Sequence, residues 1–272
     1  MTDHAHILSK PIQDVPRWRF TLRQLFWWIS VTAVLLAALH YGRLAFNQAR
    51  QASRNVSISH DFKQVIIGIQ THDDIYRTLP PAVARSSNNT KLLHDNPRRF
   101  DPSGAPLYSW RFALVHLLES NSIPCNFSHA WNTPSNAAWR GITHPAYCKD
   151  AAGDTNTNMV AVVGPGTAWG DGTTLPLSLE QIPHDTILIV QVRKSNLHWM
   201  EPGDFDLRTM PRTINAPDGS GISGGDPAGV FIGLADGSVR FVPSDTPFET
   251  LAPFFTIAGA EAGDLDEVLN AQ

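Results

Sequence analysis

The chain has 272 residues, enough for one domain with a substantial core beside an anchoring segment. Its 21 Lys and Arg against 25 Asp and Glu give a formal net charge of −4, which offers neither a basic patch for nucleic acid nor an acidic tail for a charged partner. The 20 prolines and 19 glycines favour turns and short strands over a helical bundle.

Residues 24–42 (QLFWWISVTAVLLAALHYG) are the one stretch apolar enough to cross a membrane. About 20 apolar residues span a hydrocarbon core of roughly 30 Å as a helix. Arg23 and Arg43 flank the run, where long basic side chains reach the headgroups, and two tryptophans near its start suit the interface. No small-residue cleavage site follows. We therefore predict a transmembrane helix over residues 20–45, rather than a cleaved signal peptide or a buried core helix.

The flanking residues also predict an orientation. Basic residues are slightly more numerous before the span than after it, which weakly favours a cytoplasmic N-terminus. A short tail, residues 1–19, ahead of a long polar part suits a signal-anchor that exports the C-terminal part of the chain. The expectation is a single-pass protein of the cytoplasmic (inner) membrane, with the lipid bilayer as a partner and a domain over residues 46–258 outside the cytoplasm.

A helical pattern continues beyond the span. Apolar residues recur at three- and four-residue steps from Ile58 to Ile69 and stop before Pro80-Pro81, which cannot continue a helix. The pattern predicts one long helix from about Phe20 to Tyr76, with its first half in lipid and its second half packed against the domain. A short second helix is expected over residues 110–119.

Strands are expected later in the chain. Residues 159–163 and 186–192 are rich in β-branched residues. Two further apolar runs, 229–235 and 238–242, flank Asp236-Gly237, and this pair predicts a hairpin with a type I′ turn.

The C-terminal part is expected to hold a last helix and a tail. Thr246, Pro247 and Glu249 form a capping-box pattern at the start of that helix. The small, acidic segment 259–272 is expected to be flexible.

No residue pattern predicts a catalytic, cofactor or metal site. The sequence lacks H-E-x-x-H, Cys-x-x-Cys, Gly-x-Ser-x-Gly and glycine-rich phosphate-loop motifs. The Asp-rich segment 218–226 lacks the calcium-loop consensus. Five residues near one another in sequence could gather around a metal, although solvated loop positions explain them equally well: His184, His198, Glu201, Asp204 and Asp206.

Two features leave alternatives open. In an exported domain Cys125 and Cys148 can form a disulfide, or they can remain separate thiols. Five tryptophans can line a carbohydrate-binding face, or they can fill the core, which is the commoner use in a loop-rich domain. These are Trp110, Trp131, Trp139, Trp169 and Trp199.

Several short motifs together resemble one known family. In order they are Phe62-Lys63-Gln64, Leu79-Pro80-Pro81-Ala82, Ser109-Trp110-Arg111, Cys148, Val162-Val163-Gly164-Pro165-Gly166-Thr167, Asp171-Gly172-Thr173, His198-Trp199-Met200-Glu201-Pro202 and Ala235-Asp236-Gly237-Ser238-Val239-Arg240-Phe241. The chain from Phe20 to Phe241 resembles the domain of unknown function 1559 family, bacterial proteins with a prepilin-like start. The resemblance implies a pilin-like α+β fold, in which a long N-terminal transmembrane helix packs on an antiparallel β-sheet with long loops.

The chain departs from these patterns at three places. Phe20-Thr21-Leu22 resembles a type IV prepilin start, but Arg19 stands where the processing site has Gly, and Gln24 stands where the mature helix has Glu. The two losses agree with each other and indicate an anchor that is not processed. Asp226 stands where the family has a His nine residues before the Asp-Gly pair, so the role of that His is not carried over.

The sequence therefore predicts a membrane-anchored pilin-like protein with a structural, scaffolding or recognition role and no enzymatic activity. Its expected partners are the bilayer and other pilin-like proteins or cell-envelope components. The alternative is a membrane-tethered carbohydrate- or small-ligand-binding module, which exposed tryptophans in one concave face would favour. A hydrolase or metal enzyme would require His184, His198 and Asp204 to converge.

Overall fold

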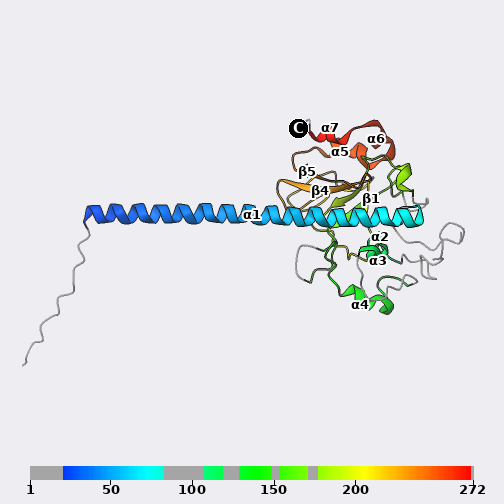
Figure 1. Cartoon of the computed structure of the whole chain (residues 1–272), viewed down its shortest axis with the longest axis horizontal. Coiled ribbons are helices and arrows are strands. Elements are labelled where there is room, and N and C mark those ends of the chain that lie inside the picture. The colour runs from blue at the N-terminus through cyan, green and yellow to red at the C-terminus, as the bar shows by residue number, and fades with distance from the viewer. Residues whose placement is uncertain (1–20, 83–106, 119–128, 149–152, 171–176, 271–272) are drawn as a thin grey trace, which may run out of the picture. The chain divides into compact units, whose positions relative to one another are not determined.

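The computed structural model describes residues 21–82, 107–118, 129–148, 153–170 and 177–270. The chain divides into two compact units, residues 1–51 and 52–272, and each is described by itself. The order of the elements along the chain can be followed by colour in Figure 1.

Helix α1 (Leu22–Tyr76) confirms the long helix expected from the periodicity and starts two residues later than expected. An 18-residue window in it has a mean hydropathy of 1.6, and none of that window is buried. Apolar side chains such as Trp27, Val34 and Leu36 are 61, 68 and 61% exposed. In the described part of the chain, α1 is the one helix long and apolar enough to cross a membrane.

The second unit is built on a five-stranded sheet with the order β3-β1-β2-β4-β5. The strands are β1 (Met159–Val163), β2 (Ile187–Gln191), β3 (Phe205–Asp206), β4 (Gly229–Leu234) and β5 (Val239–Pro243). All neighbours pair antiparallel except β1 and β3, which pair parallel. The expected α+β fold, with a long helix packed on a mostly antiparallel sheet, is thereby confirmed.

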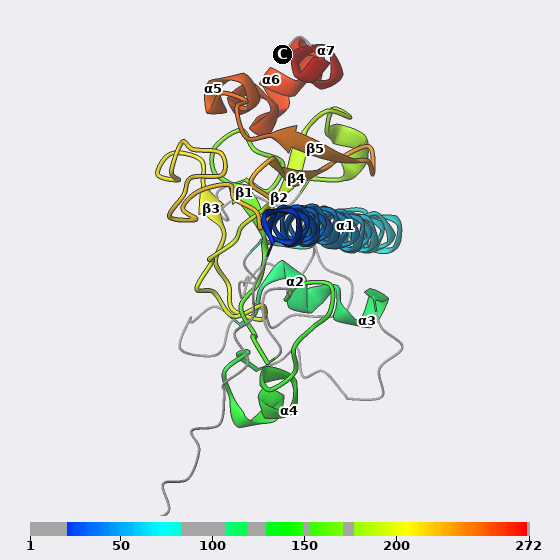
Figure 2. The same cartoon turned by 90° about the vertical axis from the view of Figure 1, so that its left-hand side faces the viewer.

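Each face of the sheet has its own core. One face packs against Phe62, Val65, Ile66 and Ile69 of α1 and against an aromatic cluster beyond the helix. Figure 2 shows that cluster's short helices on the side of α1 away from the sheet; they are α2 (Trp110–Ala113), α3 (Val115–Leu118) and α4 (Ala137–Arg140). The expected helix over 110–119 is therefore broken at Leu114.

The opposite face of the sheet packs against the C-terminal helices α5 (Phe248–Leu251), α6 (Ile257–Ala262) and α7 (Leu265–Asn270) (Figure 2). Short 3-10 turns at Pro134–Asn136, Leu179–Gln181 and Ala252–Phe255 complete the described elements.

Glycine lets α1 approach the sheet closely. A Cβ on Gly233 of β4 would lie 2.8 Å from Cγ1 of Ile189 and 2.9 Å from Cδ1 of Ile66. Real Cβ atoms do not come this close to neighbours, so a side chain here would have to displace Ile66 of α1 and Ile189 of β2. The helix can therefore seat Ile66 directly over the backbone of β4.

Local turn chemistry corrects two sequence predictions. Gly237 has a φ of 91°, but Asp236 is not among the residues with positive φ, so the turn is not type I′. The amide of Leu234 donates to Ser238 O and that of Gly237 to Leu234 O, which is the pattern of a three-residue loop ending in a left-handed glycine. The expected capping box is also absent: α5 begins one residue later, with Pro247 at the N-cap and no side-chain cap.

The segment expected to be a flexible tail, 259–272, instead continues α6 and contains α7. Two caps explain the difference. Thr256 accepts a hydrogen bond from the Gly259 amide at 3.2 Å, and Asp264 accepts one from the Glu267 amide at 2.9 Å. Leu265 is fully buried, so α7 is held by packing as well.

Candidate functional site

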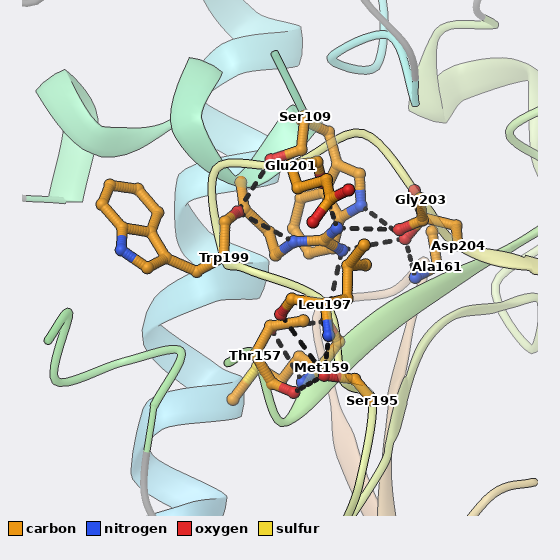
Figure 3. A network of polar contacts seen from close by, with 12 residues as sticks. Ser109, Thr157, Met159, Ala161, Ser195, Leu197, Trp199, Glu201, Gly203 and Asp204 are labelled. Carbon is orange, nitrogen blue, oxygen red and sulfur yellow. Dashed lines mark hydrogen bonds and ion pairs between the residues drawn. The ribbon is translucent and has the colours of Figure 1, made fainter. Parts of the chain in front are cut away.

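Two of the motifs noted in the sequence, 109–111 and 198–202, meet in a buried network (Figure 3). Ser109 caps α2 by accepting a hydrogen bond from the Phe112 amide, and its hydroxyl donates to Trp199 O at 2.9 Å. The Ser109 amide donates to Met200 O at 3.0 Å. The main chain at Trp199 and Met200 is thereby fixed to the start of α2.

Arg111 is the centre of this network, which we call the arginine hub: Arg111, Asp204 and the groups that bond to them. Its side chain is 0% exposed and makes five hydrogen bonds. The acceptors are Trp199 O (3.2 Å), Met159 O (3.2 Å), Asp204 Oδ1 (2.8 Å), Glu201 O (3.2 Å) and Gly203 O (2.8 Å). A planar guanidinium can satisfy several carbonyls at once, so one side chain ties α2 to β1 and to the 199–204 loop.

Asp204 balances the buried charge. Its Oδ1 accepts from Arg111, from Trp110 Nε1 at 3.0 Å and from the Ala161 amide at 2.8 Å. Burial raises the pKa of Asp204, and the charge of Arg111 acts in the opposite direction. Only 2% of its side chain is exposed, so the carboxylate is closed to solvent.

The tryptophans belong to the core. Trp110, Trp139, Trp169 and Trp199 are at most 4% exposed. The indole N–H groups of three of them donate hydrogen bonds inside the fold. Trp110 donates to Asp204, Trp169 to Leu188 O and Trp199 to Ile142 O. Only Trp131 of the five is half-buried, and it stacks on His198 with ring centroids 5.0 Å apart. This burial counts against a carbohydrate-binding face of exposed rings.

The acidic and histidine residues considered as metal ligands have separate roles. His184 is exposed in a loop, Asp204 pairs with Arg111, and Asp206 pairs with Arg208 in an exposed contact. His198 bonds to main-chain groups. Within the described ranges, no three His, Cys, Asp or Glu side chains lie together as a metal site would require.

The Asp226 and Asp-Gly positions hold the hairpin to α1. Asn55 Nδ2 donates to Asp226 Oδ2, and Lys63 Nζ donates to Gly237 O. Gln70 lies against Gly237, where a Cβ would come within 2.5 Å of its Nε2. Asp226 thus acts as a hydrogen-bond acceptor for the helix, which is a structural role.

Replacing Asp226 with alanine is expected to lower the free energy of unfolding by about 1 kcal/mol, because Asn55 and the Ala228 amide lose an acceptor. Thermal unfolding of the full chain in detergent measures this. Asp218→Ala is the matched control, since that exposed carboxylate accepts only a local hydrogen bond from Ser220. Equal shifts for the two variants would contradict a clamp on α1.

The cysteine and processing-site predictions rest partly on residues outside the described ranges. Cys125, Arg19 and Phe20 lie outside them, so the disulfide and the blocked processing site stay predictions. Gln24 is described: its Oε1 accepts from the Thr21 amide at 3.0 Å, and its amide donates to Thr21 Oγ1 at 3.3 Å. This reciprocal pair is a capping box at the start of α1.

Cys148 is buried, and burial raises the pKa of its thiol to about 12. After reduction, the folded protein should therefore resist alkylation of Cys148 at pH 8, where roughly one thiol in ten thousand would be ionised. Mass spectrometry after iodoacetamide treatment, with and without urea, measures this. Labelling that is as fast without urea as with it would contradict the buried thiol.

Sequence reasoning missed the arginine hub. Arg111 belongs to one of the motifs noted in the sequence and Asp204 was considered only as a metal ligand, but the two residues are 93 positions apart and both suit a solvated surface. The one local hint is Trp110, a large aromatic residue directly before Arg111 that suits a core position.

Comparison with protein families gives a match. A family model described as "Protein of unknown function (DUF1559)" matches residues 47–189. This range contains the domain part of α1, Arg111, the aromatic cluster up to Cys148, and strands β1 and most of β2. No curated protein and no solved structure matches the chain.

Proposed function

The chain belongs to the DUF1559 family of proteins of unknown function, and from that membership we propose a single-pass membrane protein whose C-terminal domain has a structural, scaffolding or recognition role outside the cytoplasm. The observation that carries the proposal is the first part of α1, where an apolar window of mean hydropathy 1.6 has no buried surface. Leaving such a surface in water would be costly, and a bilayer removes it.

The membrane boundaries follow from side-chain chemistry. Arg23, with Trp27 and Trp28, suits one interface, and Tyr41 with Arg43 suits the other. We place the span within residues 20–45, the short N-terminal tail in the cytoplasm and the domain on the outer side of the inner membrane.

A non-enzymatic role is supported by how the domain uses its polar residues. Asp204, His198, Asp226 and Arg111 all bond to groups inside the fold, where they join segments. Such a domain offers a stable surface held near the membrane, which suits assembly with other pilin-like proteins or cell-envelope components.

Membrane fractionation of a C-terminally tagged full chain in a bacterial host tests the anchor. The protein should stay in the pellet after carbonate and urea washes and leave it with detergent. Leu35→Arg combined with Leu36→Arg should shift it to the soluble or degraded fraction, since each arginine costs about 2.5–3.5 kcal/mol at the centre of a span. Val56→Arg is the matched control, because this exposed residue of α1 lies beyond the proposed span.

Protease treatment of intact spheroplasts tests the orientation. The tagged domain should be digested from outside, while the tail before Phe20 stays protected. Mass analysis of the extracted protein should find an intact N-terminus ahead of Phe20. A protected domain would overturn the orientation, and cleavage after Arg19 would overturn the unprocessed anchor.

A further inference from the structure

His198 lies in a position where it can hold only one uncharged form. The Met200 amide donates to its Nδ1 at 3.1 Å, so Nδ1 carries no proton. Its Nε2 lies 3.1 Å from Arg140 O, an acceptor, so Nε2 carries the proton and donates it. Both ring nitrogens are therefore committed to the main chain of two different segments.

The ring also sits inside an aromatic stack. Trp131 packs on one side with centroids 5.0 Å apart at 23°, and Trp199 lies 6.1 Å away at 25°. Trp199 continues the stack to Tyr147 at 6.0 Å and 14°. Holding His198 in place therefore also holds Trp131 and α4 against the core.

The residues after His198 carry the arginine hub. Trp199 O accepts from the Ser109 hydroxyl and from Arg111 Nε, and Met200 O accepts from the Ser109 amide. A proton on Nδ1 would place one N–H against the Met200 N–H, two donors facing each other. The contact must then break, and the turn at residues 198–200, which contains these acceptor carbonyls, must move.

We propose that His198 is an acid-sensitive latch, whose protonation at Nδ1 releases segment 198–204 from α2 and loosens the stack that holds Trp131. The change needs only a proton from solvent. When that proton binds Nδ1, the hydrogen bond from the Met200 amide is replaced by a repulsive contact between two N–H groups. The latch is local to the domain and independent of membrane anchoring.

The charged surroundings set the sign of the response. Burial lowers the pKa of His198, and the nearby positive charge of Arg140 on α4 acts in the same direction. The bond to Arg140 O and the charge of Glu201 oppose this. Asp154 lies near Asn156, the bridge partner of His198, and its Oδ1 accepts from the Asn156 amide.

Two other titratable groups lie near this stack. Asp204 is paired with Arg111, and His144, packed on Trp199 at 5.2 Å, accepts the Ala146 amide at its own Nδ1. A histidine whose folded pKa lies below its unfolded value of 6.5 contributes stability above pH 6.5. That stability is lost as the pH falls from 6.5 through the folded pKa.

Hydrogen exchange of the full chain in detergent, read by mass spectrometry between pH 7 and pH 5, tests the latch. After correction for intrinsic rates, protection of segments 107–113 and 198–204 should fall by up to about tenfold per pH unit below 6.5, while β2 and β4 keep theirs. His198→Asn should abolish this pH response, because an amide oxygen can still accept the Met200 N–H but cannot be protonated. His184→Asn, at an exposed loop position, should leave the response unchanged.

A second measurement does not depend on any variant folding. Histidine-selective NMR of the wild-type chain should find His198 as the Nε2–H tautomer at neutral pH, with a pKa below 6.5. A Nδ1–H tautomer, or a pKa at or above 6.5, would overturn the proposal. So would an equal loss of protection in the wild type and His198→Asn.

Discussion

Replacing Arg111 with methionine is expected to lower the free energy of unfolding by about 3–5 kcal/mol, the largest effect of any single substitution predicted for the domain. Methionine fills much of the same volume, but it removes five hydrogen bonds to four carbonyls and Asp204. It also leaves the buried carboxylate of Asp204 without its counter-charge in a site that is closed to water. Urea unfolding of the full chain in detergent measures the loss. Arg111→Lys should recover only part of it, because an ammonium cannot reproduce the planar fork.

Arg208→Met is the matched control for this substitution. Arg208 also pairs with an aspartate, but its side chain is 63% exposed, and exposed pairs contribute about 0–1 kcal/mol. An Arg111 variant that loses no more stability than the Arg208 variant would contradict the hub as a structural centre.

The pH dependence of the Arg111→Met deficit gives an independent check. Without the guanidinium, the pKa of Asp204 rises further above its ordinary value of 3.8, because burial is no longer opposed by a positive charge. A carboxyl with a raised folded pKa binds its proton more tightly in the folded state, so the folded state gains stability as the pH falls through that pKa. The difference between variant and wild type should therefore be largest near neutral pH and shrink toward pH 4.

The elements that could be predicted from sequence are those with a strong local pattern. The strand β1 has the expected bounds, 159–163, because its β-branched residues end at a Gly-Pro-Gly turn. Helix α1 ends at Tyr76 as its apolar steps and the following prolines required. Each of these boundaries depends on neighbours within a few residues.

The features that escaped prediction depend on distant partners. Strand β3 is two residues long and exists because Phe205 and Asp206 lie beside Val162 and Val163. The start of helix α7 is also held by Asp185, whose Oδ2 accepts the Leu265 amide from 80 residues away. In the same way, nothing in the neighbouring sequence shows that Arg111 is fully buried, since its hydrogen-bond acceptors and its counter-charge come from segments 159–161 and 199–204.

Replacing Gly233 with valine is expected to lower the free energy of unfolding by about 3 kcal/mol. The new side chain must occupy space already held by Ile66 of α1 and Ile189 of β2, both 0% exposed. Overpacking a well-packed core costs about 1–3 kcal/mol, and the upper end applies because two secondary-structure elements must shift together. Gly225→Val is the control. At this exposed glycine no atom lies within 4 Å of the position a Cβ would take, so the free energy of unfolding should change by no more than about 0.5 kcal/mol.

A double-mutant cycle separates helix displacement from a general defect in the strand. Ile66→Val removes the Cδ1 atom that lies 2.9 Å from the position a Cβ would take at Gly233. Alone, this change should lower the free energy of unfolding by about 0.5–1.5 kcal/mol. In the double variant with Gly233→Ala, the loss of unfolding free energy should be smaller than the sum of the two single-variant losses by at least about 0.5 kcal/mol, because one change makes room for the other. Additive losses would mean that α1 does not rest on β4 at Gly233. The close helix–sheet contact, and not strand propensity, is what that glycine provides.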